Sequence, residues 1–158
     1  MTVSGYVIDT SSLTALRRNY PLSIAEDIWQ GLAELSAAGR LISPREVRRE
    51  LEKKEDDLFK WAKAQEDLFK DPSSEDIVEA KKIMNTFPGL VEHDKETPDA
   101  DPFVVACARS RSFVVVADES PAGPGARPKI PDVCKELGVR CIRLVGLIEE
   151  VGWRLKRQ

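Results

Sequence analysis

The sequence predicts an α/β protein with a mostly parallel central sheet flanked by helices. Two short apolar runs, Tyr6–Ile8 and residues 113–117, lack the polar alternation of a sheet with one face in water, which is typical of strands buried on both faces. Segments with helical patterns separate these runs from weaker strand candidates at 40–42 and 139–144, and such alternation favours parallel pairing. The chain has 158 residues and no internal repeat, so we expect a single domain over residues 1–158.

The segment between the first two strands is expected to form two helices. Ser12 can cap a short helix that runs through Arg18 and ends before Pro21. Residues 23–26 have the pattern of a capping box for a second helix, which Gly39 closes. The apolar face of this second helix carries Ile24, Ile28, Leu32 and Leu35, and it should cover the sheet.

The clearest helix start in the sequence is at residues 43–46, Ser-Pro-Arg-Glu, which form a second capping box with proline at the first helical position. Apolar spacing extends this helix toward Phe69. Glu46 and Glu50 lie four residues apart on it and therefore share one face. Glu50 lies at the edge of the apolar stripe, where a helix can point a carboxylate across the end of a sheet.

The second half of the chain continues the alternation of helices and strands. Asp101 precedes a proline and is expected to be the N-cap of a helix rich in small apolar residues, which would fix its side chain in space. Before it, we expect a helix after 71–74 that Pro88-Gly89 ends, and then a polar loop at 92–98. After it come the strand at 113–117 and a proline- and glycine-rich loop at 120–128. The chain then continues with a helix at 131–137 closed by Gly138, the last strand at 139–144, and a helix at 144–153.

Composition and charge bound the class of protein. Apolar residues at 42% and charged residues at 32% are ordinary for a globular domain. The formal net charge of -3 argues mildly against a protein that depends on non-specific phosphate contacts, because most nucleic-acid binders are basic. Two basic clusters can offset this charge locally. One is Arg45, Arg48, Arg49, Lys53 and Lys54, and the other is Arg154, Lys156 and Arg157. Solvated helix faces give the same pattern.

Several other chemistries find little support in the sequence. The three cysteines, Cys107, Cys134 and Cys141, are widely spaced in apolar segments, which predicts reduced core thiols rather than disulfides or a zinc site. The single histidine, His93, lies in a polar loop, and the glycine cluster at 123–125 lacks the lysine of a phosphate-binding loop. No apolar run resembles a signal peptide or a membrane span, so we expect a cytoplasmic protein with no membrane partner.

Four carboxylates stand out by their positions. Asp9 and Asp118 each follow a buried strand, and because the carboxyl ends of parallel strands share one edge of a sheet, they should meet there. Asp101 at a helix start and Glu50 on a helix face complete the set. Taken singly, each acid can be a turn former, a helix cap or a solvated charge, so the signal lies in their joint placement. The candidate supporting residues are Thr10, Ser12, Asp99 and Glu119.

Four carboxylates brought together need a cation. Each close pair costs about 4 kcal/mol at an effective dielectric constant of about 20. A set of hard oxygen ligands suits Mg²⁺ or Mn²⁺ and does not suit a typical zinc site. Such an ion can lower the pKa of a bound water, orient it in line with a phosphodiester and neutralise the leaving oxygen. The sequence therefore predicts metal-dependent cleavage of phosphodiester bonds.

The same residues resemble the PIN-domain ribonucleases and, among them, the VapC-like toxins of type II toxin–antitoxin systems. The resembling segments occur in the family's order: Tyr-Val-Ile-Asp-Thr-Ser-Ser at 6–12, Ile-Ser-Pro-Arg-Glu-Val-Arg-Arg-Glu-Leu at 42–51, Ala-Asp-Pro-Phe-Val-Val-Ala-Cys-Ala at 100–108 and Val-Val-Val-Ala-Asp at 114–118. The stretch 129–142, with Gly152-Trp153 after it, is similar to a less characterised PIN-like subfamily.

This resemblance implies a single Rossmann-like PIN domain with Mg²⁺- or Mn²⁺-dependent endoribonuclease activity. Asp9, Glu50 and Asp101 would match the three core acids, and Asp118 the more variable fourth. The chain departs from the toxin pattern after Asp118, where Glu119 leads into a proline loop, so the fourth ligand is either Asp118 or Glu119. The resemblance also implies a cognate antitoxin that blocks the site, and many such toxins form homodimers.

Two other functions fit parts of the same pattern. A PIN-like module that binds protein or RNA without cutting it would agree with the acidic balance and with the divergent loop after Asp118. A structure-specific DNA nuclease of the flap-nuclease type ranks last, because the chain has no room for the added DNA-gripping domains.

Overall fold

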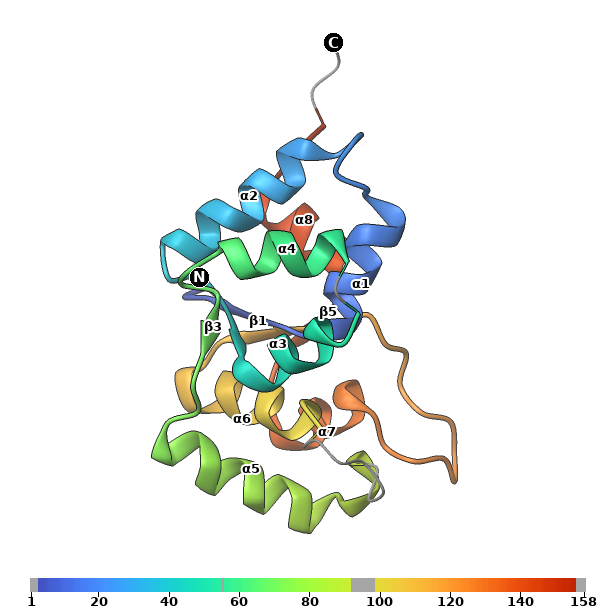
Figure 1. The fold of residues 1–158 in the computed structure, drawn as a ribbon. Coiled ribbons are helices and arrows are strands. Elements are labelled where there is room, and N and C mark those ends of the chain that lie inside the picture. The colour runs from blue at the N-terminus through green and yellow to red at the C-terminus, as the bar shows by residue number, and fades with distance from the viewer. Residues whose placement is uncertain (1–2, 55, 92–98, 156–158) are drawn as a thin grey trace.

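The computed structural model describes residues 3–54, 56–91 and 99–155. Its centre is a five-stranded sheet, in the order β3-β2-β1-β4-β5, in which all neighbouring strands are parallel (Figure 1). The strands are β1 (Tyr6–Ile8), β2 (Leu41–Pro44), β3 (Phe69–Lys70), β4 (Val114–Val116) and β5 (Cys141–Ile142). The predicted α/β fold with a mostly parallel sheet is therefore confirmed.

Helices cover both faces of this sheet. In Figure 1, α1, α2, α4 and α8 lie on one side of it, and α6 and α7 lie on the other side with α5 packed outside α6. In chain order the helices of the described residues are α1 (Thr10–Asn19), α2 (Glu26–Ala37), α3 (Arg45–Glu52), α4 (Asp57–Ala64), α5 (Ser74–Thr86), α6 (Asp101–Arg111), α7 (Ile130–Leu137) and α8 (Leu144–Val151), with a short 3-10 turn, η1 (Pro88–Leu90), before α6. No helix in these described ranges combines the length and the apolar character needed to cross a membrane.

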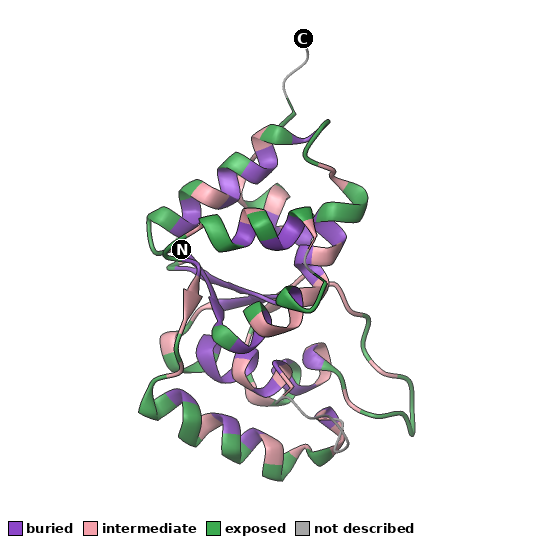
Figure 2. Ribbon diagram, viewed as in Figure 1, coloured by how far each residue is buried: buried purple, intermediate pink, exposed green. Residues whose placement is uncertain are grey.

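The central strand β1 and its neighbours β2 and β4 are buried along their whole lengths (Figure 2). Strands β1 and β4 position the site. They pair with Val7 opposite Val115 and Ile8 opposite Val116, and all four of these side chains are fully buried. Because the two strands end at the same level, the backbone N–H of Asp9 donates to the carbonyl of Val116 at 2.9 Å. The residues that follow both strands therefore lie at one edge of the sheet.

The predicted cap of the first helix is wrong by three residues. The N-cap of α1 is Asp9 and not Ser12, because the Asp9 carboxylate accepts a hydrogen bond from the backbone N–H of Ser11 at 3.3 Å. An aspartate at the end of a strand is as good an N-cap as a serine, so the helix begins as soon as the strand ends.

Neither predicted capping box in the first half of the chain forms. Ser43 and Pro44 belong to β2, and the Ser43 hydroxyl donates instead to the carbonyl of Ile8 in the neighbouring strand at 2.7 Å. Residues 21–25 form a turn, in which the N–H groups of Ile24 and Ala25 both donate to the carbonyl of Pro21, so α2 starts later, without a side-chain cap. Ile24 is consequently exposed rather than part of the buried helix face.

The long helix predicted from residue 44 to Phe69 is two helices and a strand. The chain leaves α3 after Glu52, and α4 starts anew where the Asp56 carboxylate accepts from the N–H of Phe59 at 3.0 Å. Phe69 then pairs with Ser43, which adds β3 to the edge of the sheet. The later elements agree with the prediction, including the end of α7 at Gly138, which has a φ of 69°. The polar loop at 92–98 with His93 lies outside the described residues, as do Lys156 and Arg157.

Candidate active site

A cavity of about 420 Å³ opens at the carboxyl edge of the sheet. Its walls come from the start of α1, from α3, from the start of α6, and from the segment between β4 and α7. The carboxylates that line it among the described residues are Asp9, Glu50, Asp99, Asp101 and Glu119. The other lining residues are Thr10, Ser11, Leu90, Arg127, Pro128 and Lys129. We refer to this space as the acidic cavity.

Asp9 is the most buried of these acids, with 2% of its surface exposed. One carboxylate oxygen, Oδ2, accepts hydrogen bonds from the backbone N–H of Ser11 at 3.3 Å and from its hydroxyl at 2.7 Å. The other oxygen, Oδ1, is buried and has no hydrogen-bond partner among the described residues. Burial raises the pKa of Asp9, although the hydrogen bonds from Ser11 oppose this shift. Oδ1 is therefore an atom that a proton or a cation would stabilise.

Asp101 is the first residue of α6 rather than its N-cap. Ala100 already has helical backbone angles, with φ at -73° and ψ at -27°, and no side-chain hydrogen bond caps this helix. The predicted cap is therefore wrong by one residue, and the carboxylate of Asp101 lines the acidic cavity instead. Burial, and after it the negative charges of Asp9 and Glu119, together raise the pKa of Asp101 to about 9.

A hydroxyl group connects two walls of the cavity. The Thr10 hydroxyl, at the start of α1, donates to Glu50 Oε1 on α3 at 2.9 Å. This contact holds the Glu50 carboxylate toward the end of β1. Glu46, one turn earlier on α3, is buried but does not line the cavity, and its Oε2 has no hydrogen-bond partner within the described ranges.

The two candidates for the fourth acid are in different surroundings. Asp118 Oδ1 accepts hydrogen bonds from the Ser12 hydroxyl at 2.8 Å and from the N–H of Leu144 at 2.7 Å. Asp118 and Ser12 do not line the acidic cavity, whereas Glu119 does. Burial raises the pKa of Glu119, and the charge of Asp9 adds to this shift. The structure thus brings Asp9, Glu50, Asp99, Asp101 and Glu119 together and leaves Asp118 outside the group.

Three polar residues of this cavity were not predicted from the sequence: Ser11, Arg127 and Lys129. Ser11 could have been found, because an aspartate N-cap accepts from the N–H two positions further along the chain. The two basic residues carried no such signal, since they lie in a loop whose path depends on distant contacts.

Comparison with known proteins places the chain in a family. Residues 6–155 match a family described as a domain of unknown function, DUF4411. The chain belongs to this family. No curated protein matches it in sequence.

A solved structure shares the fold of this DUF4411 chain. A chain of VapBC-1 from nontypeable Haemophilus influenzae superimposes with a TM-score of 0.53 at 15% sequence identity, over 89% of this chain and 98% of that one. PAE2754 from Pyrobaculum aerophilum gives a TM-score of 0.47 at 14% identity, over 96% of this chain and 98% of that one. The likeness to VapBC-1 confirms the VapC-like PIN fold that the sequence resemblance implied.

The donor set of the acidic cavity fits a hard divalent cation. In residues 3–54, 56–91 and 99–155, no group of three His, Cys, Asp or Glu side chains is close enough to form a coordination sphere. Repulsion of about 4 kcal/mol per close pair keeps uncompensated carboxylates apart, so they surround the cavity rather than converge. The carboxylate donors are all oxygen atoms, which suits Mg²⁺ or Mn²⁺, and Asp9 Oδ1 supplies a ligand atom that no group of the described residues satisfies.

Proposed function

We propose that this chain is a metal-dependent endoribonuclease that hydrolyses RNA at the acidic cavity. Asp9, Glu50 and Asp101 are the residues to which we assign Mg²⁺ or Mn²⁺. We assign the fourth position to Glu119 and not to Asp118, because Glu119 lines the cavity. The observation that carries the proposal is the buried, unpartnered Asp9 Oδ1 in a cavity lined by further carboxylates. The resemblance to PIN-domain ribonucleases supports the same reading.

The protein side chains prepare this site in three ways. Ser11 holds one oxygen of Asp9 and thereby orients the other, and Thr10 fixes Glu50 beside it. Asp101 retains a proton near neutral pH while no cation is present, since its pKa is raised to about 9. A bound divalent cation would supply an activated water and would neutralise charge on the leaving oxygen.

We also propose a role as the toxin of a toxin–antitoxin pair, acting in the cytoplasm. The chain resembles VapC-like toxins and shares its fold with a chain of VapBC-1. The partner we propose is a cognate antitoxin protein that covers the acidic cavity, and a homodimer is a second expected assembly. Expression of the wild-type chain alone should arrest growth, and Asp9→Asn should relieve the arrest. Equal arrest by both proteins would contradict this role.

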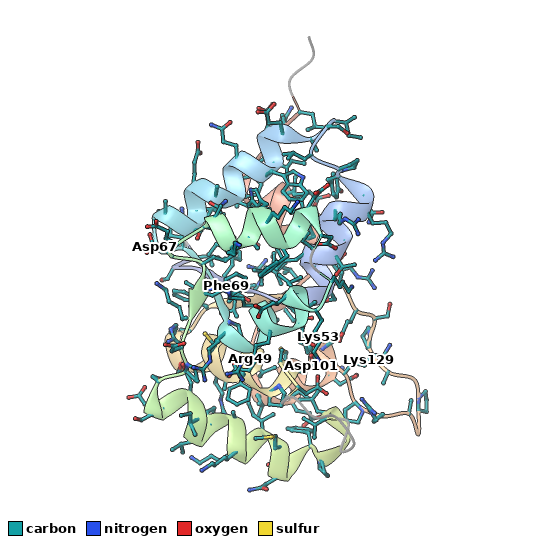
Figure 3. The ribbon with its side chains drawn as sticks, viewed as in Figure 1. Arg49, Lys53, Asp67, Phe69, Asp101 and Lys129 are labelled. Atoms are coloured by element: carbon teal, nitrogen blue, oxygen red, sulfur yellow. The ribbon has the colours of Figure 1, made fainter. Side chains whose placement is uncertain are left out.

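Cleavage of RNA by the purified protein tests the enzymatic proposal. Mixed single-stranded RNAs should be cut in Mn²⁺ or Mg²⁺, and Asp9→Asn and Asp101→Asn should each reduce the rate by at least about 100-fold. Asp67→Asn is a matched control, because Asp67 is exposed and lies far from Asp101 in Figure 3. Cleavage that persists undiminished in both cavity variants would mean that a contaminant cuts the RNA.

Calorimetry with Mn²⁺ separates the nuclease from a non-catalytic PIN-like binding module. The nuclease should bind Mn²⁺ in the wild-type chain and should bind it more weakly after Glu50→Gln. A wild-type chain that binds RNA or a protein partner but shows no Mn²⁺ binding would favour the binding module.

A further inference from the structure

Two basic residues, Arg127 and Lys129, form part of the wall of the acidic cavity. They come from the segment between β4 and α7, which returns to the cavity after leaving it at Glu119. These positive charges would not attract a ligand made only of cations. A ligand that brings negative charge beside the carboxylates would be attracted to it.

The backbone of this segment is held at both ends by one carboxylate. Asp132 Oδ2, in the first turn of α7, accepts hydrogen bonds from the N–H of Ala122 at 3.0 Å and from the N–H of Lys129 at 2.8 Å. The N–H of Ile130 donates to the Glu119 carboxylate at 3.4 Å. These contacts fix the backbone position of Lys129 and link the start of α7 to Glu119, an acid of the cavity.

The stem of Arg127 packs on a glycine. A Cβ atom added at Gly89 in η1 would lie 3.0 Å from Arg127 Cγ and 3.1 Å from Pro128 Cδ. Contacts that short suit glycine, and any other residue here would need Arg127 or Pro128 to shift by a few tenths of an ångström. Leu90, the next residue, also lines the acidic cavity. Arg127 is therefore positioned by packing at the cavity wall.

Further positive charge lies on the α3 side of the cavity. Lys53 follows Glu50 by three residues, so its side chain lies on the same side of α3 as that carboxylate. In the view of Figure 3, Arg49 lies to the left of Asp101, Lys129 lies to its right, and Lys53 lies above it. Cationic side chains from α3 and from the segment before α7 therefore surround Asp101 in this view.

We propose that Arg127 and Lys129 bind the backbone phosphates of single-stranded RNA and hold the strand across the acidic cavity. This inference rests on the proposed nuclease function and assigns its substrate form and its positioning residues. A single strand fits because Asp9 is only 2% exposed, inside a cavity of about 420 Å³. A duplex keeps its phosphates on a broad rigid cylinder, whereas one strand can bend a phosphate into such a space.

Binding of a labelled single-stranded RNA 12-mer tests the inference. All proteins carry Asp9→Asn, so that the RNA stays intact in Mn²⁺, and fluorescence anisotropy is measured over a series of salt concentrations. Arg127→Gln/Lys129→Gln in this background should bind about 10- to 30-fold more weakly at low salt. The slope of log affinity against log salt should become shallower by about 1.4, since each lost phosphate contact on a single strand removes about 0.7.

The matched control is Arg18→Gln/Arg154→Gln in the same background. Both of these residues are exposed, and Arg18 lies about 12 Å further along α1 than Thr10. The control should keep the affinity and the salt slope of the background protein. Arg127→Lys/Lys129→Arg keeps both positive charges and should keep the slope as well. This result would show that the Gln variant lost charge and not merely its folded structure. An unchanged slope in the Gln variant, or no RNA binding by the background protein, would overturn the inference.

Two further results separate this inference from the proposed function. A duplex 12-mer of the same sequence should bind more weakly than the single strand, and tighter binding of the duplex would overturn the assignment of a single strand. A wild-type chain that cuts RNA with a KM unaffected by Arg127→Gln/Lys129→Gln would overturn the inference but not the nuclease. A wild-type chain that binds RNA through these residues without cutting it would overturn the nuclease but not the inference.

Discussion

The hydroxyl of Ser12 in α1 donates to Asp118 Oδ1, after β4, at a distance of 2.8 Å. The same oxygen accepts from the N–H of Leu144 at the start of α8, so one carboxylate connects three elements of the fold. Glu119, the next residue, lines the acidic cavity instead. Two adjacent acids at the end of one strand therefore have different surroundings.

Asp118→Ala should destabilise the fold more than it affects metal binding. The change leaves the Ser12 hydroxyl and the Leu144 N–H without an acceptor, and the free energy of unfolding should fall by about 2 kcal/mol. Glu119→Gln should leave stability nearly unchanged but weaken Mn²⁺ binding by about tenfold. Urea denaturation and calorimetry on both variants check this, and the reverse pattern would restore Asp118 as the fourth ligand.

Asp101 should make the metal-free protein less stable as the pH rises. Its pKa is raised to about 9 by burial and by neighbouring carboxylates, while an unfolded aspartate titrates near about 4. Between these values the folded state binds a proton that the unfolded state has lost, so the free energy of unfolding decreases as the pH rises from about 4 toward 9.

Asp101→Asn removes this dependence. At pH 8 without metal, the variant should be more stable than the wild type by about 1 to 3 kcal/mol. At pH 4 the difference should be small. Thermal or urea unfolding in a chelator measures both values, and a variant that is less stable at pH 8 would show that Asp101 is not strained by its surroundings.

A strand can be predicted from sequence when its own residues show a strand pattern. Three consecutive valines make β4 recognisable, because only a strand buried on both faces is so uniformly apolar. Phe69 and Lys70 form β3 only because β2 offers them a free edge, and two residues carry no pattern of their own. The helix starts at Ser12 and Ser43 were misjudged because each hydroxyl has a more distant partner, Asp118 or the Ile8 carbonyl.

The same limit applies to the acidic cavity. Asp9, Glu50 and Asp101 can be selected from sequence, since the position of each relative to a strand or a helix decides where it lies. The choice between Asp118 and Glu119 depends on α8, which follows more than twenty residues later and supplies the Leu144 N–H. The stem of Arg127 packs closely on Gly89, and no local pattern encodes that contact.

Asp76 should give the fold a stability that is lost in acid. It is 2% exposed and accepts hydrogen bonds from Arg111 at 2.9 Å, from the Ser110 hydroxyl at 2.8 Å and from the N–H of Ser73 at 3.0 Å. Burial alone would raise the pKa of Asp76, but the hydrogen bonds from Arg111, Ser73 and Ser110 outweigh it and lower the pKa. The stabilisation is therefore complete above the unfolded pKa of about 4 and disappears as the pH falls through the lower folded pKa.

Asp76→Asn should lower the free energy of unfolding by about 2 to 4 kcal/mol at pH 7, because it leaves the Arg111 charge without its partner. The difference from the wild type should shrink at pH 3. Urea denaturation at the two pH values is the measurement, and a difference of equal size at both would contradict the assigned cause.

The three cysteines should differ in reactivity. A hydrogen bond from the Cys134 thiol lowers the pKa of Cys141, which is also the least buried of the three. Burial raises the pKa of Cys107 to about 12. Iodoacetamide at pH 7.5 should therefore label Cys141 first in the native protein, as followed by mass spectrometry, and unfolding should remove the order. Faster labelling of Cys107 than of Cys141 would contradict this prediction.

The most direct test of the account is a crystal of the full chain soaked in Mn²⁺ and measured for anomalous scattering. The account predicts an anomalous peak in the acidic cavity, within bonding distance of Asp9 Oδ1 and of a carboxylate oxygen of Asp101, and loss of that peak in Asp9→Asn. A peak beside Asp118, or a cavity without one at Mn²⁺ concentrations that support RNA cleavage, would contradict it.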